Sequence, residues 1–284
     1  MAKQAGPLLA TLFTAWPKEK KKQIRTWLKF QAITVNGRPV SQFDHPLKPG
    51  DQVAVRTDRF ATPKTRLPSG LKIYLEDAHL LVVEKPEGLL SISSPAEPEK
   101  TAFFQLTEYL RHKHPRSRER VWIVHRLDRE TSGLMMFAKT APAKEALQSK
   151  WDTFAKRYEA VVEGRLPAQA GVLESDLDES NPHHVAVRPK SERTRHAVTQ
   201  YRVLKAGPRR SLVELTLETG RRHQIRVQLA EAGCPIVGDE KYGAKTDPAG
   251  RLGLHACFLR FRHPVTGEEL HFTSPLPKPL VRLV

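Results

Sequence analysis

Short apolar segments separated by turn residues make up most of the chain from Leu71 to its carboxyl end. Residues 71–75, 80–83 and 158–163 have the length and apolar content of strands, and residues 213–218 alternate apolar with polar side chains, as in a sheet with one face in water. Helix-length stretches are few and do not alternate regularly with these strands. The pattern favours a mixed or antiparallel sheet of the α+β class over a doubly wound parallel sheet.

A polar loop at residues 125–132 lies between two apolar runs, 122–124 and 133–138, that each have the character of a buried strand. A rigid sheet rim of this kind is a common place for catalytic groups. Asp128 is the central acid. We expect it to be ionised, with a lowered pKa, because it is flanked by His125, Arg126 and Arg129. From the residue types alone, a surface loop that contains a structural ion pair is an equally good interpretation.

A second polar cluster occupies residues 219–226, directly after the alternating strand. We expect a helix to begin near Arg221 and to end at Gly233. Arginines in the first turn of a helix oppose the positive end of its dipole. A nearby anion, either the Asp128 carboxylate or a phosphate, would remove that conflict. A further short helix is expected at residues 142–151.

The charge balance points to a polyanionic partner. The chain has 47 Lys plus Arg against 31 Asp plus Glu, a formal net charge of +16 over 284 residues. Nucleic acid is the usual partner of such a charge, and no basic amphipathic helix with a bulky apolar face supports an anionic membrane instead. No apolar run is long enough to span a membrane. Two separated cysteines, Cys234 and Cys257, agree with a reducing compartment, so we expect a cytoplasmic protein.

Positive charge is concentrated near the amino terminus, where residues 1–60 contain 11 Lys or Arg and four Asp or Glu. An apolar stripe of Ile24, Trp27 and Leu28 runs beside a row of cations at helical spacing, which consists of Lys18, Lys21, Lys22, Arg25 and Lys29. One face of this helix would pack, and the other would offer cations to phosphates. A solvated lysine face without a ligand is the alternative.

The segment after this helix contains a hairpin signal, Asn36-Gly37, and an alternating strand near residues 47–55. Helix, hairpin and strand together resemble the S4 RNA-binding module. The resemblance implies a small S4-like α/β domain at residues 1–57, which binds RNA through the basic helix. A linker at residues 58–70 and a catalytic domain at residues 71–284 would follow.

The loop sequence His-Arg-Leu-Asp-x-x-Thr-Ser-Gly, which ends at Gly133, resembles the catalytic signature of the RluA family of RNA pseudouridine synthases. The cluster at 219–226 and the run Lys-x-Tyr-x-Ala at 156–160 resemble two further motifs of that family, and the likeness extends over residues 71–277. It implies the pseudouridine synthase fold, with a mixed, largely antiparallel central sheet flanked by helices and loops. The histidine that many members have shortly after Gly88 is missing here.

The resemblance also assigns roles. Asp128 would act at the ribose of a flipped uridine, Arg221 would form its ion pair, and Tyr158 would stack on the uracil. From spacing alone, Tyr158 is an ordinary strand aromatic. Arg126 would occupy the space left by the flipped nucleotide. The remaining RNA-contacting candidates in this part of the chain are His125, Arg129, Lys156 and Arg226.

The implied reaction is an isomerisation of uridine in ribosomal or transfer RNA. It breaks the N1–C1′ bond, turns the base and joins C5 to C1′, so it needs no cofactor, nucleotide or metal, and no motif for any of these is present. Attack by the carboxylate at C1′ and proton removal from C2′ both remain open. We expect a monomer.

Three other functions compete with this interpretation. A kinase loop also begins His-Arg, but no glycine-rich phosphate loop or Asp-Phe-Gly is present. A glycosidase that pairs Asp128 with Glu130 would need one of the two acids protonated, which the surrounding arginines oppose. A non-catalytic RNA-binding protein with a degenerate synthase domain is the third alternative, and the intact motifs speak against it.

Overall fold

The computed structural model describes residues 5–17, 19–29, 33–55, 65–92, 97–113, 119–181 and 184–284. The chain divides into two compact units, Met1–Thr62 and Pro63–Val284, and each unit is described by itself. Of the expected linker, residues 58–64 lie outside the described residues, whereas Thr65–Arg66 form a short strand of the second unit. Within the described ranges, no helix is long and apolar enough to cross a membrane.

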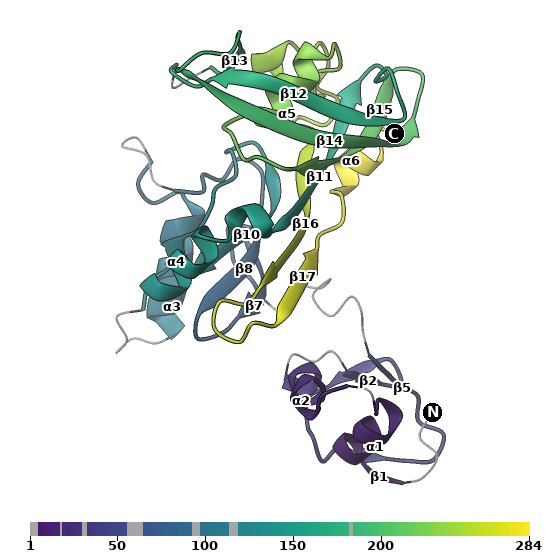
Figure 1. Ribbon diagram of the computed structural model, residues 1–284. Coiled ribbons are helices and arrows are strands. Elements are labelled where there is room, and N and C mark those ends of the chain that lie inside the picture. Colours follow the sequence, from purple (N-terminus) through teal and green to yellow (C-terminus); the bar gives the residue numbers. More distant parts are fainter. Residues whose placement is uncertain are drawn as a thin grey trace. The chain divides into compact units, whose positions relative to one another are not determined.

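The first unit packs two helices on a small antiparallel sheet (Figure 1). Its elements are α1 (Leu8–Ala15), α2 (Lys21–Lys29), the sheet β3 (Arg38–Val40), β2 (Ile33–Val35) and β5 (Val53–Val55), and the pair β1 (Gly6–Pro7) and β4 (Pro46–Leu47). The expected Asn-Gly turn is present between β2 and β3. Asn36 and Gly37 have φ values of 49° and 78°, which a tight hairpin turn requires.

The helix α2 has the expected two faces. Ile24 and Leu28 are buried in the core of the unit, and Trp27 packs against that core. The side chains of Lys21, Lys22 and Arg25 are exposed on the other face. Lys18 and the Lys29 side chain lie outside the described residues.

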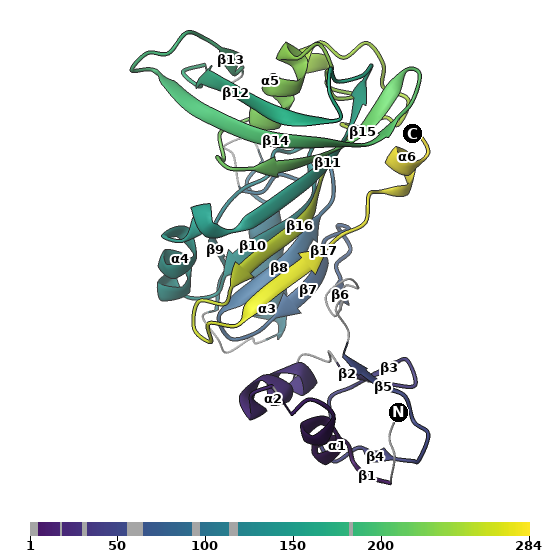
Figure 2. The same cartoon turned by 45° about the vertical axis from the view of Figure 1, so that its right-hand side comes forward.

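The second unit is built on one sheet of 12 strands in the order β13-β12-β14-β15-β11-β16-β10-β8-β7-β6, with β17 beside β16 and β9 beside β10 (Figures 1 and 2). Among the described strand pairs, only β10 with β16 is parallel. The expected mixed, largely antiparallel sheet is therefore confirmed. The bounds are β6 (Thr65–Arg66), β7 (Lys72–Glu76), β8 (Leu80–Lys85), β9 (Trp122–Ile123), β10 (Ser132–Ala138), β11 (Ala155–Glu163), β12 (Ala170–Asp178), β13 (Ala186–Val187), β14 (Thr194–Ala206), β15 (Arg210–Leu217), β16 (Leu254–Arg262) and β17 (Glu269–Thr273).

The helices of this unit are short. They are α3 (Ala102–Lys113), α4 (Ala141–Gln148), α5 (Gln224–Glu231) and α6 (Lys278–Val281), with 3-10 turns at Trp151–Thr153 and Glu240–Tyr242. Apolar side chains of α3 pack against β7, β8 and β10, and those of α5 pack against β11, β14 and β15, so the unit has two main cores. The helix expected at residues 142–151 is α4, which Thr140 caps by accepting a hydrogen bond from the Ala143 amide.

The helix that was expected to begin near Arg221 is α5. Its expected start is wrong, because α5 begins at Gln224. The Arg221 amide donates to the Gln224 side chain at 3.0 Å, and the Arg222 amide donates to Glu179 at 2.6 Å. His223 has a φ of 53°, a left-handed conformation that does not continue into an α-helix. Residues 219–223 therefore precede the helix, and Arg226 is the arginine that lies in its first turn.

The strand-loop-strand around residue 128 is present, and β9 pairs directly with β10. Residues 122 and 123 are half-buried rather than buried, which differs from expectation. Gly133 has a φ of 122°, and a Cβ there would collide with the backbone of Ala256. Only glycine lets β10 approach β16 this closely at the end of the loop.

Candidate active site

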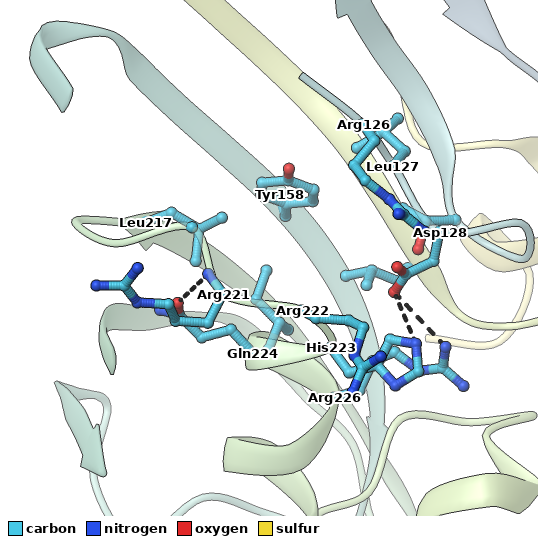
Figure 3. Close-up of a pocket in the computed structure, with 14 residues that line it drawn as sticks. Arg126, Leu127, Asp128, Tyr158, Leu217, Arg221, Arg222, His223, Gln224 and Arg226 are labelled. Carbon is cyan, nitrogen blue, oxygen red and sulfur yellow. Dashed lines mark hydrogen bonds and ion pairs between the residues drawn. The ribbon is translucent and has the colours of Figure 1, made fainter. Parts of the chain in front are cut away.

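A pocket of about 180 Å³ lies where the 126–131 loop meets the turn before α5. Tyr158 of β11 and the apolar side chains of Leu217 and Leu254 line it as well (Figure 3). The three motifs that are far apart in the sequence thus meet at one cavity.

The loop that carries Asp128 is held by its backbone. The Ser91 hydroxyl donates to the Leu127 carbonyl at 2.6 Å and accepts from the Leu127 amide at 3.1 Å, so it fixes the peptide groups on both sides of this residue. Lys85, which is fully buried, donates to the carbonyls of Pro86, Leu89 and Arg129. Burial lowers the pKa of Lys85 to about 7. The peptide groups flanking Asp128 therefore have little freedom.

The Asp128 carboxylate faces the pocket, with 19% of its side chain exposed. Its Oδ2 atom lies 3.6 Å from Nη1 of Arg226 and 3.8 Å from Nε2 of His223, and Figure 3 marks both contacts. Burial raises the pKa of Asp128, Arg226 and Arg126 oppose the shift, and Glu130 adds to it. The expected lowering of this pKa is therefore wrong, because desolvation outweighs the neighbouring positive charges.

Arg226, not Arg221, forms the ion pair with Asp128. Arg226 is held by two hydrogen bonds of 2.7 Å to the fully buried Asp239 carboxylate, and its Nη1 also lies 3.5 Å from Glu130. The expectation for Arg221 is wrong because this residue lies in the turn before α5. Its Nε donates to the carbonyl of His196 at 3.1 Å, and its exposed side chain lines the pocket.

Tyr158 lies in the middle of the sheet, opposite Leu215 of β15 and Ala256 of β16. Burial and the Asp128 carboxylate raise its pKa, so its hydroxyl is neutral at physiological pH. Figure 3 shows the Tyr158 ring between Leu217 and the loop that carries Arg126. The pocket therefore offers an aromatic ring and a carboxylate to the same bound group.

The other predicted site residues are divided between the pocket and the surrounding scaffold. Arg126 is exposed and lines the pocket. His125 stacks on Trp151 at 4.4 Å and accepts the Met136 amide at 3.0 Å, and burial lowers its pKa to about 3. Lys156 is buried and donates to the Trp151 carbonyl. Arg129 pairs with Glu97. The last three do not line the pocket.

The family profile described as "RNA pseudouridylate synthase" matches residues 79–231. The chain belongs to this family. The synthase is 34% identical to the ribosomal large subunit pseudouridine synthase D of Yersinia pestis, over 97% of the chain and 88% of that protein. It is 35% identical to an uncharacterized RNA pseudouridine synthase of Bacillus subtilis, over 92% of the chain and 88% of the relative.

Solved structures agree with this assignment. Human RNA pseudouridylate synthase domain containing 4 has a TM-score of 0.62 and 28% identity, and the match covers 74% of the chain and 90% of the human one. Human RNA pseudouridylate synthase domain containing 1 has a TM-score of 0.59 and 25% identity, with 75% and 86% covered. The protein is an RNA pseudouridine synthase, an isomerase with the pseudouridine synthase fold.

Sequence reasoning missed several residues around this synthase's pocket. Leu217 could have been found, because it continues the apolar face of the 213–218 alternation. Ser91 had no signal, since nothing local marks a serine that contacts a loop 36 residues away. Asp239 and Tyr242 lie within the stretch that resembles the family, but their contacts with Arg226 and His223 depend on the folded chain.

Proposed function

We propose that Asp128 is the carboxylate that acts at the ribose of a flipped uridine, and that the target lies in ribosomal RNA, with transfer RNA as the second candidate. The single observation that carries the first part is the pocket itself. The pocket combines a buried carboxylate, an aromatic ring and an exposed arginine. The carboxylate suits the sugar, the ring suits the base, and the arginine suits a phosphate or the space that the flipped base leaves in the stack.

Arg226 keeps Asp128 ionised in this proposal. Both routes, attack at C1′ and removal of the C2′ proton, need an unprotonated carboxylate. Burial opposes ionisation, and the guanidinium 3.6 Å away offsets part of that cost. Because Asp239 already binds Arg226 on its other edge, the arginine stays in place when RNA enters.

Tyr158 stacks on the detached uracil while it turns. A neutral phenol has no charge to repel the Asp128 carboxylate, and its ring remains available on the pocket side. Arg126 and Arg221 are the exposed cations at the pocket and would contact the RNA backbone or the strand that the uridine leaves.

The first unit serves as an S4-like RNA-binding domain in this proposal. The exposed row of Lys21, Lys22 and Arg25 on α2 supports it, since the opposite face of the helix is used in packing.

The relatives named for the ribosomal large subunit favour ribosomal RNA as the target. Free Cys234 and Cys257 agree with the cytoplasm.

The decisive experiment compares Asp128→Asn with Glu130→Gln in single turnover on ribosomal RNA fragments. We expect Asp128→Asn to abolish pseudouridine formation and Glu130→Gln to retain it. RNA binding should change little in either variant. Because burial raises the pKa of Asp128, the charge costs stability as pH rises through that pKa, and the neutral asparagine should not lower Tm. Pseudouridine made by Asp128→Asn would refute the assignment.

The target RNA is tested by mapping. Pseudouridines in total RNA from cells with and without the protein should differ at sites in large-subunit ribosomal RNA. A difference confined to transfer RNA would move the assignment to the second candidate. A non-catalytic RNA-binding protein would leave every pseudouridine in place.

A further inference from the structure

The His223 ring lies between the Asp128 carboxylate and the Tyr242 hydroxyl. Its Nδ1 is 2.7 Å from Oη of Tyr242, and its Nε2 is 3.8 Å from Oδ2 of Asp128. We propose that His223 is a neutral hydrogen-bond donor to Asp128, and that Tyr242 is a positioning residue that decides which ring nitrogen carries the proton. The catalytic part of this inference rests on the proposed role of Asp128.

The direction of the hydrogen bonds follows from the Tyr242 hydroxyl. The Val185 amide donates to this oxygen at 3.1 Å, and an amide N–H can only donate. The hydroxyl proton is then available for Nδ1 of His223, which accepts it. A neutral imidazole with Nδ1 as acceptor carries its own proton on Nε2, the nitrogen that faces Asp128.

The opposite tautomer is unfavourable on two counts. It would point the Nε2 lone pair at the Asp128 carboxylate, so two acceptors would face each other. It would also leave the Tyr242 proton to find another acceptor, and among the described residues the structure records none. Both contacts of the ring therefore select the same tautomer.

The ring is neutral because of its surroundings. Burial lowers the pKa of His223 to about 4, and the charges of Arg226, Lys241 and Arg222 act in the same direction, opposed by Asp239. An imidazolium would also compete with Arg226 for Asp128. A neutral donor supports the ionised carboxylate through a hydrogen bond without adding another charge to the pocket.

The gap of 3.8 Å is longer than a hydrogen bond, and the proposal therefore includes a tightening of this contact when RNA fills the pocket. The backbone at His223 is already committed to holding the ring there. Its φ of 53° is a left-handed conformation that is uncommon outside Gly, although His, like Asn and Asp, is enriched in it. A conformation of this kind is retained where a side chain must point in one direction.

The tautomer is tested on the full chain without RNA. Imidazole ¹³C and ¹⁵N chemical shifts of His223 should report a neutral Nε2–H ring near neutral pH. Tyr242→Phe keeps the aromatic ring but frees Nδ1, so the His223 titration should move to higher pH. Tyr109→Phe removes a hydroxyl that bonds Glu76, far from the ring in sequence, and should leave the titration unchanged. An Nδ1–H ring in the wild type would overturn the inference.

The catalytic consequence is tested with His223→Gln, whose amide can donate near the position of Nε2, and His223→Leu, which has no donor. Both variants place a residue in the left-handed conformation at position 223, and their Tm values report on folding. We expect His223→Leu to lower the single-turnover rate by about 10-fold to 100-fold with little change in RNA Kd, and His223→Gln to restore part of it. The acid limb of the rate profile should move to higher pH only in His223→Leu.

The charged and titratable groups that act on Asp128 and bear on this pH profile are Arg226, Glu130, Arg126, Tyr158, Tyr242 and the buried Lys85, whose own pKa is about 7. All of them are unchanged in the His223 variants, so a shifted acid limb reports the lost donor. Equal rates and an unmoved limb in both variants would overturn the donor role. Activity in Asp128→Asn would instead refute the proposed function, and the tautomer measurement would still stand.

Discussion

The two walls of the pocket are held in different ways. The wall of residues 126–131 is fixed through its backbone, by the Ser91 hydroxyl and the buried Lys85 ammonium. The wall of residues 220–226 also has backbone hydrogen bonds, at the Arg221 and Arg222 amides, but it depends above all on one of its own side chains, that of Arg226, which pairs with Asp239. The first wall can therefore carry different side chains without losing its shape, whereas the second loses its shape when one charge is removed.

Among the variants that test this comparison, Arg226→Ala should have the largest effect on stability and activity. It leaves the fully buried Asp239 without its guanidinium, which should cost about 3–5 kcal/mol of unfolding free energy and most of the activity. Arg221→Ala is the matched control for stability, because its exposed side chain bonds only a backbone carbonyl among the contacts recorded; its loss of activity should come from weaker RNA binding. Denaturant unfolding and single-turnover rates measure both. Equal losses in the two variants would contradict the difference between the arginines.

Ser91→Ala tests the backbone-held wall. It removes both hydrogen bonds to Leu127 and leaves buried peptide groups unpaired, which should cost about 1–3 kcal/mol of stability. Because the peptide groups beside Asp128 lose their restraint, kcat should fall more than KM changes. Ser149→Ala, which removes an exposed hydroxyl, serves as the control. A stability loss with an unchanged kcat would mean that Ser91 supports only the fold.

Glu130→Gln changes a charge in the 126–131 wall, and its effect should be seen in the pH dependence of activity. Activity requires the ionised form of Asp128, so it is lost as pH falls through the pKa of that residue. Glu130 raises this pKa, and its removal should move the acid limb of kcat to lower pH. The shift should be less than about one unit, because solvent screens the half-exposed Glu130 side chain. A shift to higher pH would show that Glu130 supports the carboxylate instead.

The smallest effect on chemistry is expected outside both walls. Replacing Lys21, Lys22 and Arg25 with Gln should weaken RNA binding and reduce its salt dependence by a slope of about 0.7 for each lost phosphate contact. The rate constant for bound RNA should stay the same. Fluorescence anisotropy across a salt series measures the slope, and an unchanged slope would identify the row as a solvated face.

The sequence predicted what depends on local pattern. The strands β7 to β11, β15 and the Asn36-Gly37 turn were recognised from apolar runs, alternation and turn chemistry, whereas β12, β13 and β14 were not predicted. The loop of Asp128 followed from two apolar runs and one motif. The sheet class was correct because strands and helices do not alternate regularly in the described part of the second unit.

Long-range contacts explain what could not be predicted. The start of α5 depends on Glu179 binding the Arg222 amide, and this shift decides which arginine reaches Asp128. The raised pKa of Asp128 depends on burial, which a count of nearby charges does not include. The motifs identified the right segments, but they do not show in which direction each side chain within them points.

The parallel contact of β10 with β16 also bears on when the enzyme becomes active during its synthesis. β16 lies between β10 and β11 in the sheet, yet it is formed by residues 254–262, long after both neighbours have left the ribosome. Until then the strands that carry Asp128 and Tyr158 have no common edge, and Leu254 is missing from the pocket. A nascent chain therefore cannot modify RNA before residues 254–262 have been made and have joined the sheet.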